Sequence, residues 1–356
     1  MSELLSRVIE KTGSLDGEAM AAAAARQEQL TKPLGSLGRL EEISVRLAGI
    51  QGKPLPEIKH KAIITMAGDH GVVAEGVSLW PQEVTAQMVY NFLGGGAAIN
   101  VLARQIGARV VVVDMGVAAD LEPDAQLLSR KVGHGTANMA QGPAMTVEQA
   151  VQALEAGIEI VTGEANRGLD IVGTGDMGIG NTSASSAICA VITGKPVAEV
   201  TGRGTGVEGA QLAHKREVVE KALAVNKPDA RQPLEVLAKV GGFEIGGLAG
   251  VMLAAAAQRI PVVIDGFISG AAALIATSLA PGVKEFLIAG HVSAEAGHRL
   301  LLGHLGLKPL LDLDMRLGEG TGAALGIFLA EAAARVLAEM PTFAEAGVSE
   351  KSEMEK

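Results

Sequence analysis

Short runs that are apolar throughout, each followed by a glycine-bearing polar turn and then a helical pattern, constrain the fold of this chain more than any other feature. The runs occupy residues 62–67, 110–113, 169–172, 261–264 and 286–289. A strand with one buried face alternates apolar and polar residues, so unbroken apolar runs indicate strands covered on both faces. Their alternation with helices predicts an α/β fold with a doubly wound parallel sheet.

The composition agrees with this architecture. A length of 356 residues predicts about two domains. Only 2% of the residues are aromatic, while 46 are glycine, so the core must consist of small aliphatic side chains. Such residues suit helices that pack closely on a parallel sheet.

Local signals also place several helices. Asp16 opens a predicted helix over residues 16–30, and the following segment 31–35 breaks it because Pro33 lacks a backbone donor. Leucine and isoleucine recur at helical spacing over residues 37–50. Residues 146–149 (TVEQ) form a capping box, and a last long helix is predicted over residues 321–340.

Charge and cysteine usage exclude several classes of protein. The net charge of −10 disfavours a nucleic-acid partner, and few aromatic side chains are available to stack on bases. Cys189 is the single cysteine, so an internal disulfide is excluded. We expect neither a signal peptide nor a membrane span, and we predict a cytoplasmic protein.

The segments that follow the predicted strands are all polar and rich in glycine. Ligands of an open parallel sheet bind beyond the carboxyl ends of its strands, so these segments together outline a candidate site. They comprise residues 68–71 (GDHG), 114–116 (DMG), 173–182 (GTGDMGIGNT), 265–267 (DGF) and 290–293 (GHVS).

The spacing Gly173-x-Gly175-x-x-Gly178 resembles a dinucleotide fingerprint, with Glu199 near the position of a ribose-binding acid. The helix is expected to start only after Asn181, which is late for that motif. A phosphate cradle made by backbone N–H groups of residues 178–183 is the favoured interpretation. A plain tight turn is the alternative.

Three further residues have a functional and a structural interpretation. Arg203, in a glycine-rich loop, could bind a phosphate or carboxylate, or lie in solvent. Lys215 is a solvated residue unless the fold turns it toward the cradle. Ser293 precedes a helix and could simply cap it.

The sequence predicts no metal site and no cofactor. Asp69 and His70 could be a metal pair, but two residues do not make a site, and a hydrogen-bonded turn is the favoured interpretation. No P-loop motif is present, and Cys189 lies in an apolar helical pattern typical of an inert buried thiol.

Glu319 is flanked by glycines and precedes a very apolar helix. It could compensate the positive end of that helix. It could also be a general base whose small neighbours let a ring lie against the backbone.

Several motifs, in order along residues 31–330, resemble those of the nicotinate-nucleotide–dimethylbenzimidazole phosphoribosyltransferase family. The most specific is MRLGEGTGAA at residues 315–324. The others are TKPLGSLGRLE at 31–41, AGDHGV at 67–72, PQEVT at 81–85, GGGAAIN at 94–100, GIGNT at 178–182, TGRGT at 201–205 and SAE at 293–295.

The resemblance implies an enzyme that converts nicotinate mononucleotide and 5,6-dimethylbenzimidazole to α-ribazole 5′-phosphate and nicotinate, with inversion, in cobalamin synthesis. It also implies a homodimer with a Rossmann-like α/β domain over residues 57–320. A small helical domain would be formed by residues 1–56 and 321–356. A nicotinamide-dependent oxidoreductase and a non-catalytic nucleotide-binding module are the alternatives.

The resemblance also implies residue roles. Glu319 falls on the catalytic base. Asp176 stands where the family has a glutamate, so an auxiliary catalytic role there would fall to a carboxylate one methylene shorter. The substrate-binding positions are Ser78, Gln87 and Leu317 for the benzimidazole and Gly178, Gly180, Asn181, Thr182, Lys215 and Ser293 for the phosphate, with Arg203 as a further candidate.

Overall fold

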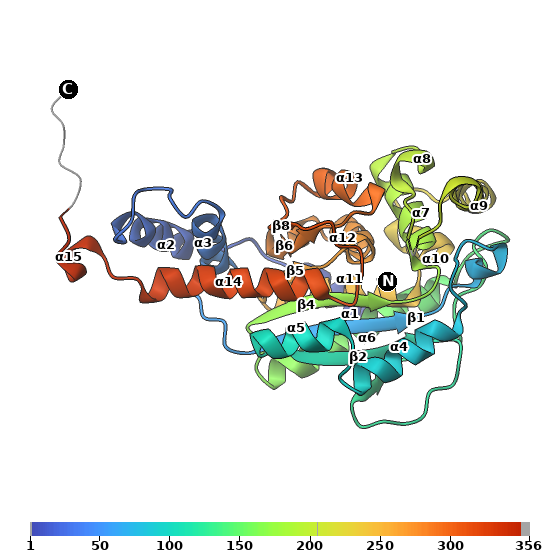
Figure 1. Cartoon of the computed structure of the whole chain (residues 1–356), viewed down its shortest axis with the longest axis horizontal. Helices are drawn as coiled ribbons and strands as arrows, with labels where there is room; N and C mark the ends of the chain where they lie inside the picture. The colour runs from blue at the N-terminus through green and yellow to red at the C-terminus, as the bar shows by residue number, and fades with distance from the viewer. Residues whose placement is uncertain (1, 205, 350–356) are drawn as a thin grey trace. The chain divides into compact units, whose positions relative to one another are not determined.

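A six-stranded parallel sheet organises the chain in the computed structural model, which describes residues 2–204 and 206–349 (Figure 1). The strand order is β3-β2-β1-β4-β5-β6, which confirms the predicted α/β class and doubly wound topology. Each predicted apolar run overlaps one strand. The strands are β1 (Lys61–Gly68), β2 (Arg109–Gly116), β3 (Leu127–Ser129), β4 (Ile171–Met177), β5 (Val262–Ile264) and β6 (Leu287–Ala289).

Helices connect these strands, and a small parallel pair, β7 (His291–Val292) and β8 (Leu311–Asp312), follows the sheet. The helices are α1 (Glu3–Lys11), α2 (Gly17–Gln29), α3 (Arg39–Gln51), α4 (Glu83–Leu93), α5 (Ala98–Ile106), α6 (Val147–Asn166), α7 (Asn181–Thr193), α8 (Val197–Val200), α9 (Gly209–Asn226), α10 (Pro233–Val240), α11 (Phe243–Ala257), α12 (Phe267–Leu279), α13 (Ala296–Leu305), α14 (Thr321–Glu339) and α15 (Phe343–Ala346), with 3₁₀ turns η1 (Gly71–Glu75) and η2 (Pro281–Phe286).

Both faces of the sheet are covered. On β1, Met66 faces Gly247 of α11, while Ile63 lies beside Gly320 at the start of α14. Helix α11 packs on α6 with the backbones almost touching, because a side chain on Gly157 would overlap the carbonyl of Gly247. Glycine is therefore needed where these two helices meet.

The sheet order reverses between β1 and β4, which pair in register from Lys61 with Ile171 to Ala67 with Met177. Helices on either side of such a switch point diverge and leave a crevice at the carboxyl ends of the strands. The turns after β1 and β4 therefore end side by side there.

The described residues divide into two compact units, the first made of residues 2–13, 60–204 and 206–327 and the second of residues 14–59 and 328–349. The family resemblance implied that residues 1–56 belong together, and this is wrong for the first thirteen. Leu5 of α1 is fully buried, and α1 packs with α6 and α11 in the sheet unit.

The second unit has its own polar contacts. Asp16 caps α2 by accepting a hydrogen bond from the amide of Ala19 at 2.9 Å, as the sequence predicts. Arg26 donates to the carbonyls of Leu337 and Met340, at 2.7 and 3.2 Å, near the end of α14. These contacts join segments from the two ends of the chain within one unit.

Helix α14 is long and apolar enough to cross a membrane by length and composition alone. However, 56% of its most apolar stretch is buried within the protein. Core helices of soluble proteins share these properties, so α14 is weak evidence for a membrane span.

Candidate active site

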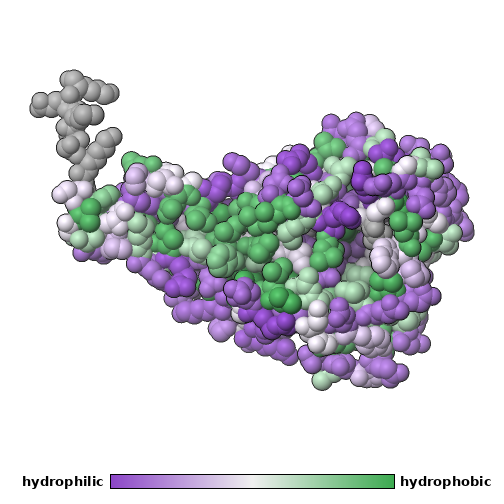
Figure 2. Space-filling model, in the orientation of Figure 1, coloured by the Kyte–Doolittle hydropathy of each residue, from purple (hydrophilic) through white to green (hydrophobic). Residues whose placement is uncertain are grey.

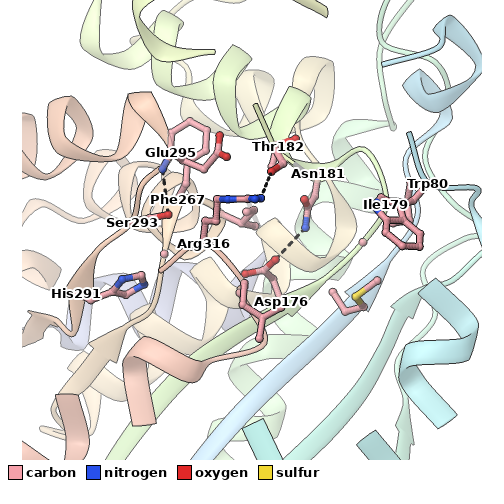
Figure 3. Close-up of a pocket in the computed structure, with 17 residues that line it drawn as sticks. Trp80, Asp176, Ile179, Asn181, Thr182, Phe267, His291, Ser293, Glu295 and Arg316 are labelled. Carbon is pink, nitrogen blue, oxygen red and sulfur yellow. Dashed lines mark hydrogen bonds between the residues drawn. The ribbon is translucent and has the colours of Figure 1, made fainter. Parts of the chain in front are cut away.

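A pocket of about 300 Å³ opens at the carboxyl ends of the strands, at the predicted site (Figure 3). Trp80 and Ile179 stand on one side of it, and His291 and Ser293 on the other. The wall thus combines apolar and polar groups. Its residues are Trp80, Asp176, Met177, Gly178, Ile179, Asn181, Thr182, Gly204, Gly266, Phe267, Ile268, His291, Ser293, Glu295, Arg316, Leu317 and Gly318.

Asp176, on β4, is one of the two carboxylates that line this pocket. One of its oxygens accepts a hydrogen bond from the side-chain amide of Asn181 at 2.9 Å. The other oxygen is buried without a hydrogen-bond partner. Burial, with the nearby charges of Asp265 and Glu244, raises the pKa of Asp176 well above its usual range. A protonated Asp176 could donate a hydrogen bond to a ligand.

The strand β4 continues to Met177, so Gly173 and Gly175 lie within the sheet and not in a turn. A dinucleotide motif needs its first glycines in the turn after the strand. This geometry is incompatible with the dinucleotide interpretation of the GxGxxG spacing.

Gly178 and Ile179 line the pocket, whereas Gly180, which follows them and leads into α7, is not part of the described pocket wall. A side chain on Gly178 would overlap the carbonyl of Gly68, and one on Gly180 would come within 2.7 Å of Val73. The amide of Ile179 donates to the hydroxyl of Thr85 at 3.1 Å. Packing against η1 and β1 therefore explains these glycines, and Ile179 already uses its amide inside the protein.

Lys215 is fully buried on α9, and its Nζ donates to the hydroxyl of Thr182 at 2.8 Å. Burial lowers the pKa of Lys215 to about 8, opposed by the charge of Glu295. The fold therefore turns Lys215 toward the predicted cradle and away from solvent, and Thr182 connects it to the pocket wall.

Ser293 lines the pocket, and its hydroxyl accepts a hydrogen bond from the amide of Glu295 at 3.3 Å. Its own amide donates to Nδ1 of buried His298 at 2.8 Å. Burial lowers the pKa of His298 to about 3, so His298 is a neutral acceptor that fixes the position of Ser293.

Two arginines in glycine-rich segments, Arg203 and Arg316, lie in different surroundings. Arg203 pairs with Glu208 at 2.6 Å and is 65% exposed, outside the pocket wall. Arg316 lines the pocket and donates to the carbonyl of Gly204 at 3.1 Å. Sequence reasoning missed Arg316 as a site residue, although it lies three residues before Glu319.

Glu319 is buried, with its carboxylate accepting a hydrogen bond from the amide of Ile99, at the start of α5, at 3.2 Å. The pocket wall includes Leu317 and Gly318 but, among the described residues, does not include Glu319. Burial raises the pKa of Glu319, partly offset by the Ile99 hydrogen bond. A raised pKa moves a carboxylate toward the range of a general base at neutral pH.

The predicted benzimidazole-binding residues are not all in the pocket wall. Leu317 lines the pocket and is 58% exposed. Ser78 lies outside the wall, with its hydroxyl accepting from the amide of Trp80 at 3.1 Å and donating to its carbonyl at 3.2 Å. Ser78 thus shapes the turn that carries Trp80. Gln87, on α4, is exposed outside the pocket.

Asp69 and His70 are engaged in internal hydrogen bonds. Asp69 accepts from the hydroxyl of Thr85 at 2.7 Å, and His70 Nε2 lies 2.6 Å from the carboxylate of Glu244. Within residues 2–204 and 206–349, no cluster of three or more His, Cys, Asp or Glu is arranged to hold a metal.

Comparisons with known proteins identify the family of this chain. A family model described as phosphoribosyltransferase matches residues 12–348. A nicotinate-nucleotide–dimethylbenzimidazole phosphoribosyltransferase of Desulforudis audaxviator is 62% identical to the chain, and the match covers 98% of this chain and 99% of that protein. The chain belongs to this phosphoribosyltransferase family.

Other members support the assignment. The Roseiflexus sp. protein of the same name is also 62% identical over 98% of this chain and 99% of its own. A crystal structure of CobT from Thermus thermophilus is 51% identical and superposes with a TM-score of 0.90, covering 94% of this chain and all of the other. The resemblance seen in the sequence motifs is thus confirmed along nearly the whole length.

Proposed function

We propose that this protein transfers the 5-phosphoribosyl group of nicotinate mononucleotide to 5,6-dimethylbenzimidazole, with inversion, releasing α-ribazole 5′-phosphate and nicotinate. The observation that carries the proposal is full-length identity of 62% to proteins named for that reaction. The mixed lining of the pocket is consistent with it, because one substrate is an apolar ring system and the other an anionic nucleotide.

The reaction exchanges one bond at the ribose C1′ carbon. A benzimidazole nitrogen attacks C1′ on the side opposite nicotinate, and the C1′–N bond to nicotinate breaks with its electron pair returning to the pyridine ring. The product ring is cationic until its second N–H loses a proton. Nicotinate departs with a neutral ring nitrogen, so the leaving group needs no Lewis acid.

In this proposal Glu319 accepts the proton from the benzimidazole. Its buried carboxylate has a raised pKa, which makes it a better proton acceptor than an exposed glutamate at neutral pH. Its hydrogen bond with the Ile99 amide holds the group at a defined position while leaving the second oxygen for substrate.

The phosphate-binding role is assigned to the Gly178–Thr182 turn, Lys215 and Ser293. Lys215 lies one hydrogen bond behind Thr182, so it can place positive charge near a bound anion. We add Arg316, which faces the same pocket, as a second cation for the phosphate or the nicotinate carboxylate. Arg203 could join them only by leaving Glu208.

The base-binding role is assigned to Ser78, Gln87 and Leu317. Of these, Leu317 offers an exposed apolar side chain at the pocket, and Ser78 acts through the backbone of Trp80. Asp176 is assigned an auxiliary role as a neutral hydrogen-bond donor, in keeping with its raised pKa.

The enzyme is further proposed to be a cytoplasmic homodimer. Figure 2 shows apolar residues gathered along α14, and Phe328 on this helix is 54% exposed. Exposed apolar surface of this kind is typical of a surface that a partner covers. Sedimentation velocity of the purified protein tests this, and a monomer at micromolar concentration would contradict it.

The decisive experiment for the reaction incubates the protein with both substrates and separates the products by chromatography. We expect equal amounts of nicotinate and α-ribazole 5′-phosphate, with none when either substrate is omitted. Binding of the mononucleotide without product would instead favour a non-catalytic module.

A further inference from the structure

The segment that carries Glu319 has an unusual backbone. Gly318, Glu319 and Gly320 have φ angles of +83°, +63° and +99°. Glycine adopts this left-handed region readily, but a residue with a side chain rarely does. Such a conformation persists only where the surrounding structure holds it, and it often occurs at functional sites.

Hydrogen bonds from three adjacent strands hold this segment. The amide of Glu319 donates to the carbonyl of Asp176 on β4 at 3.1 Å. The hydroxyl of Thr65, on β1, donates to the carbonyl of Glu319 at 2.9 Å. Both peptide groups of Glu319 are therefore fixed to the sheet.

Asp265, directly after β5, holds the residues that follow. Its carboxylate accepts hydrogen bonds from the amides of Gly320, Gly322 and Ala323, at 3.2, 2.6 and 3.1 Å. Asp265 and Thr65 both have 0% exposure. A fully buried carboxylate is costly, and here it serves to fix the backbone on the far side of Glu319.

A carboxylate suits this task better than an amide. Both of its oxygens accept, and together they take three N–H groups, whereas an asparagine would turn an NH₂ donor toward at least one of those amides. Strand β4 also lies directly against this segment, since a side chain on Gly175 would overlap the carbonyl of Glu319. This contact restricts the backbone of Glu319 further.

We infer that Asp265 and Thr65 are positioning residues that hold Glu319 in its left-handed conformation and so aim its carboxylate. The inference rests on the proposed role of Glu319 as the base. Neither residue needs to touch a substrate, since Thr65 acts through the carbonyl of Glu319 and Asp265 acts through the amides of the residues that follow Glu319.

The test measures kcat and KM for Asp265→Asn, Thr65→Val, Thr65→Ser and Glu319→Gln, and for the double variant of Asp265→Asn with Glu319→Gln. Misplacing a catalytic group by about 1 Å costs about 10²-fold in rate. We expect Asp265→Asn to lower kcat by about 10- to 10²-fold with KM for the mononucleotide within about three-fold. Thr65→Val should lower kcat by about three- to ten-fold, and Thr65→Ser, which keeps the hydroxyl, should restore it.

The double variant distinguishes positioning from an independent role. If Asp265 acts through Glu319, the double variant should be no slower than Glu319→Gln alone, within about two-fold, because effects of residues that act as one unit are not additive. A multiplicative loss would overturn the inference. Glu164→Gln is the matched control, a buried carboxylate on α6 paired with Arg109 at 2.7 Å, and it should keep the wild-type kcat.

The outcomes separate the two proposals. Full turnover in Glu319→Gln would reject the proposed base itself. Slow turnover there, with wild-type kcat in Asp265→Asn and Thr65→Val, would reject only the positioning role. If Asp265→Asn fails to fold, as judged by thermal unfolding, the contrast between Thr65→Val and Thr65→Ser decides, and equal kcat in both overturns the inference.

Discussion

Replacing Lys215 with methionine should weaken substrate binding while leaving the protein at least as stable. Lys215 is fully buried, and its ammonium is predicted to sit behind Thr182 as a source of charge for the bound phosphate. Methionine keeps most of the volume and removes the charge. Binding and stability should therefore change in opposite directions.

The size of the stability effect follows from the pKa. The pKa of Lys215 falls from 10.5 to about 8 because burial disfavours the ammonium. Each pH unit of that difference is about 1.4 kcal/mol, so the buried charge costs the folded protein about 3 kcal/mol at pH 7. Loss of the hydrogen bond between Lys215 and Thr182 lowers the stability of the folded variant by about 1 kcal/mol. A net gain of about 2 kcal/mol in the free energy of unfolding, or about 3 °C in Tm, is expected.

The pH dependence has a definite sign. Between about pH 8 and 10.5 the unfolded chain holds the proton on Lys215 and the folded protein does not, so wild-type stability rises with pH through this window. The stability gained by Lys215→Met over the wild type should therefore be largest at pH 7 and should decrease toward pH 10. An ammonium roughly 6 Å behind a negatively charged phosphate interacts with it by about 3 kcal/mol at an effective dielectric constant of about 20, so KM for the mononucleotide should rise by at least about ten-fold.

Differential scanning fluorimetry at several pH values and steady-state kinetics measure both effects. Lys221→Met is the control on the same helix, because Lys221 is 52% exposed and paired with Glu75, and it should change neither quantity appreciably. A lower Tm at pH 7 with unchanged KM in Lys215→Met would refute the reasoning and make Lys215 a structural residue.

Three further substitutions test other parts of the site. Asp176→Asn replaces a carboxyl group that its raised pKa keeps neutral, so kcat should fall by less than about ten-fold and Tm at pH 7 should rise. A loss of kcat as large as that of Glu319→Gln would make Asp176 a catalytic group. In Gly175→Ala the added methyl group should push against the carbonyl of Glu319 and lower kcat, whereas Gly163→Ala, on an open helix surface, should keep the wild-type kcat. Equal kcat in the two variants would show that the close approach of Gly175 to Glu319 does not matter for turnover. Cys189→Ser should keep the wild-type kcat because burial raises the pKa of the Cys189 thiol to about 12. An inactive variant with unchanged Tm would show that the thiol is not inert.

Sequence patterns predicted the sheet well because burial on both faces imposes unbroken apolar runs. The exception is β3, in which Leu127 and Leu128 are partly buried and Ser129 is exposed, so that no such run is present. The capping box at Thr146 and the Asp16 cap were also predictable, since each depends on residues three apart in the chain. Capping signals of this kind depend only on residues close together in the chain, so the sequence alone predicts them.

The site was less predictable because its geometry depends on contacts between distant residues. Gly173 and Gly175 resembled the first glycines of a dinucleotide fingerprint, but pairing with β1 extends β4 through both. Arg203 lies between two glycines and Arg316 lies two residues before Gly318, and only tertiary structure places Arg316 on the pocket wall. The packing of α1 with α6 and α11, which places the first residues in the sheet unit, likewise cannot be read from the local sequence.

The single-turnover rate of Glu319→Gln tests the central claim most directly. Glutamine keeps the size of the side chain and its oxygen can still accept the Ile99 hydrogen bond, but it cannot take a proton from the benzimidazole. General-base catalysis is worth about 10²–10⁴-fold, so the account predicts a fall in that range with both substrates still bound and the Tm close to wild type. A single-turnover rate within about two-fold of wild type would contradict the account, because proton removal would then not depend on Glu319.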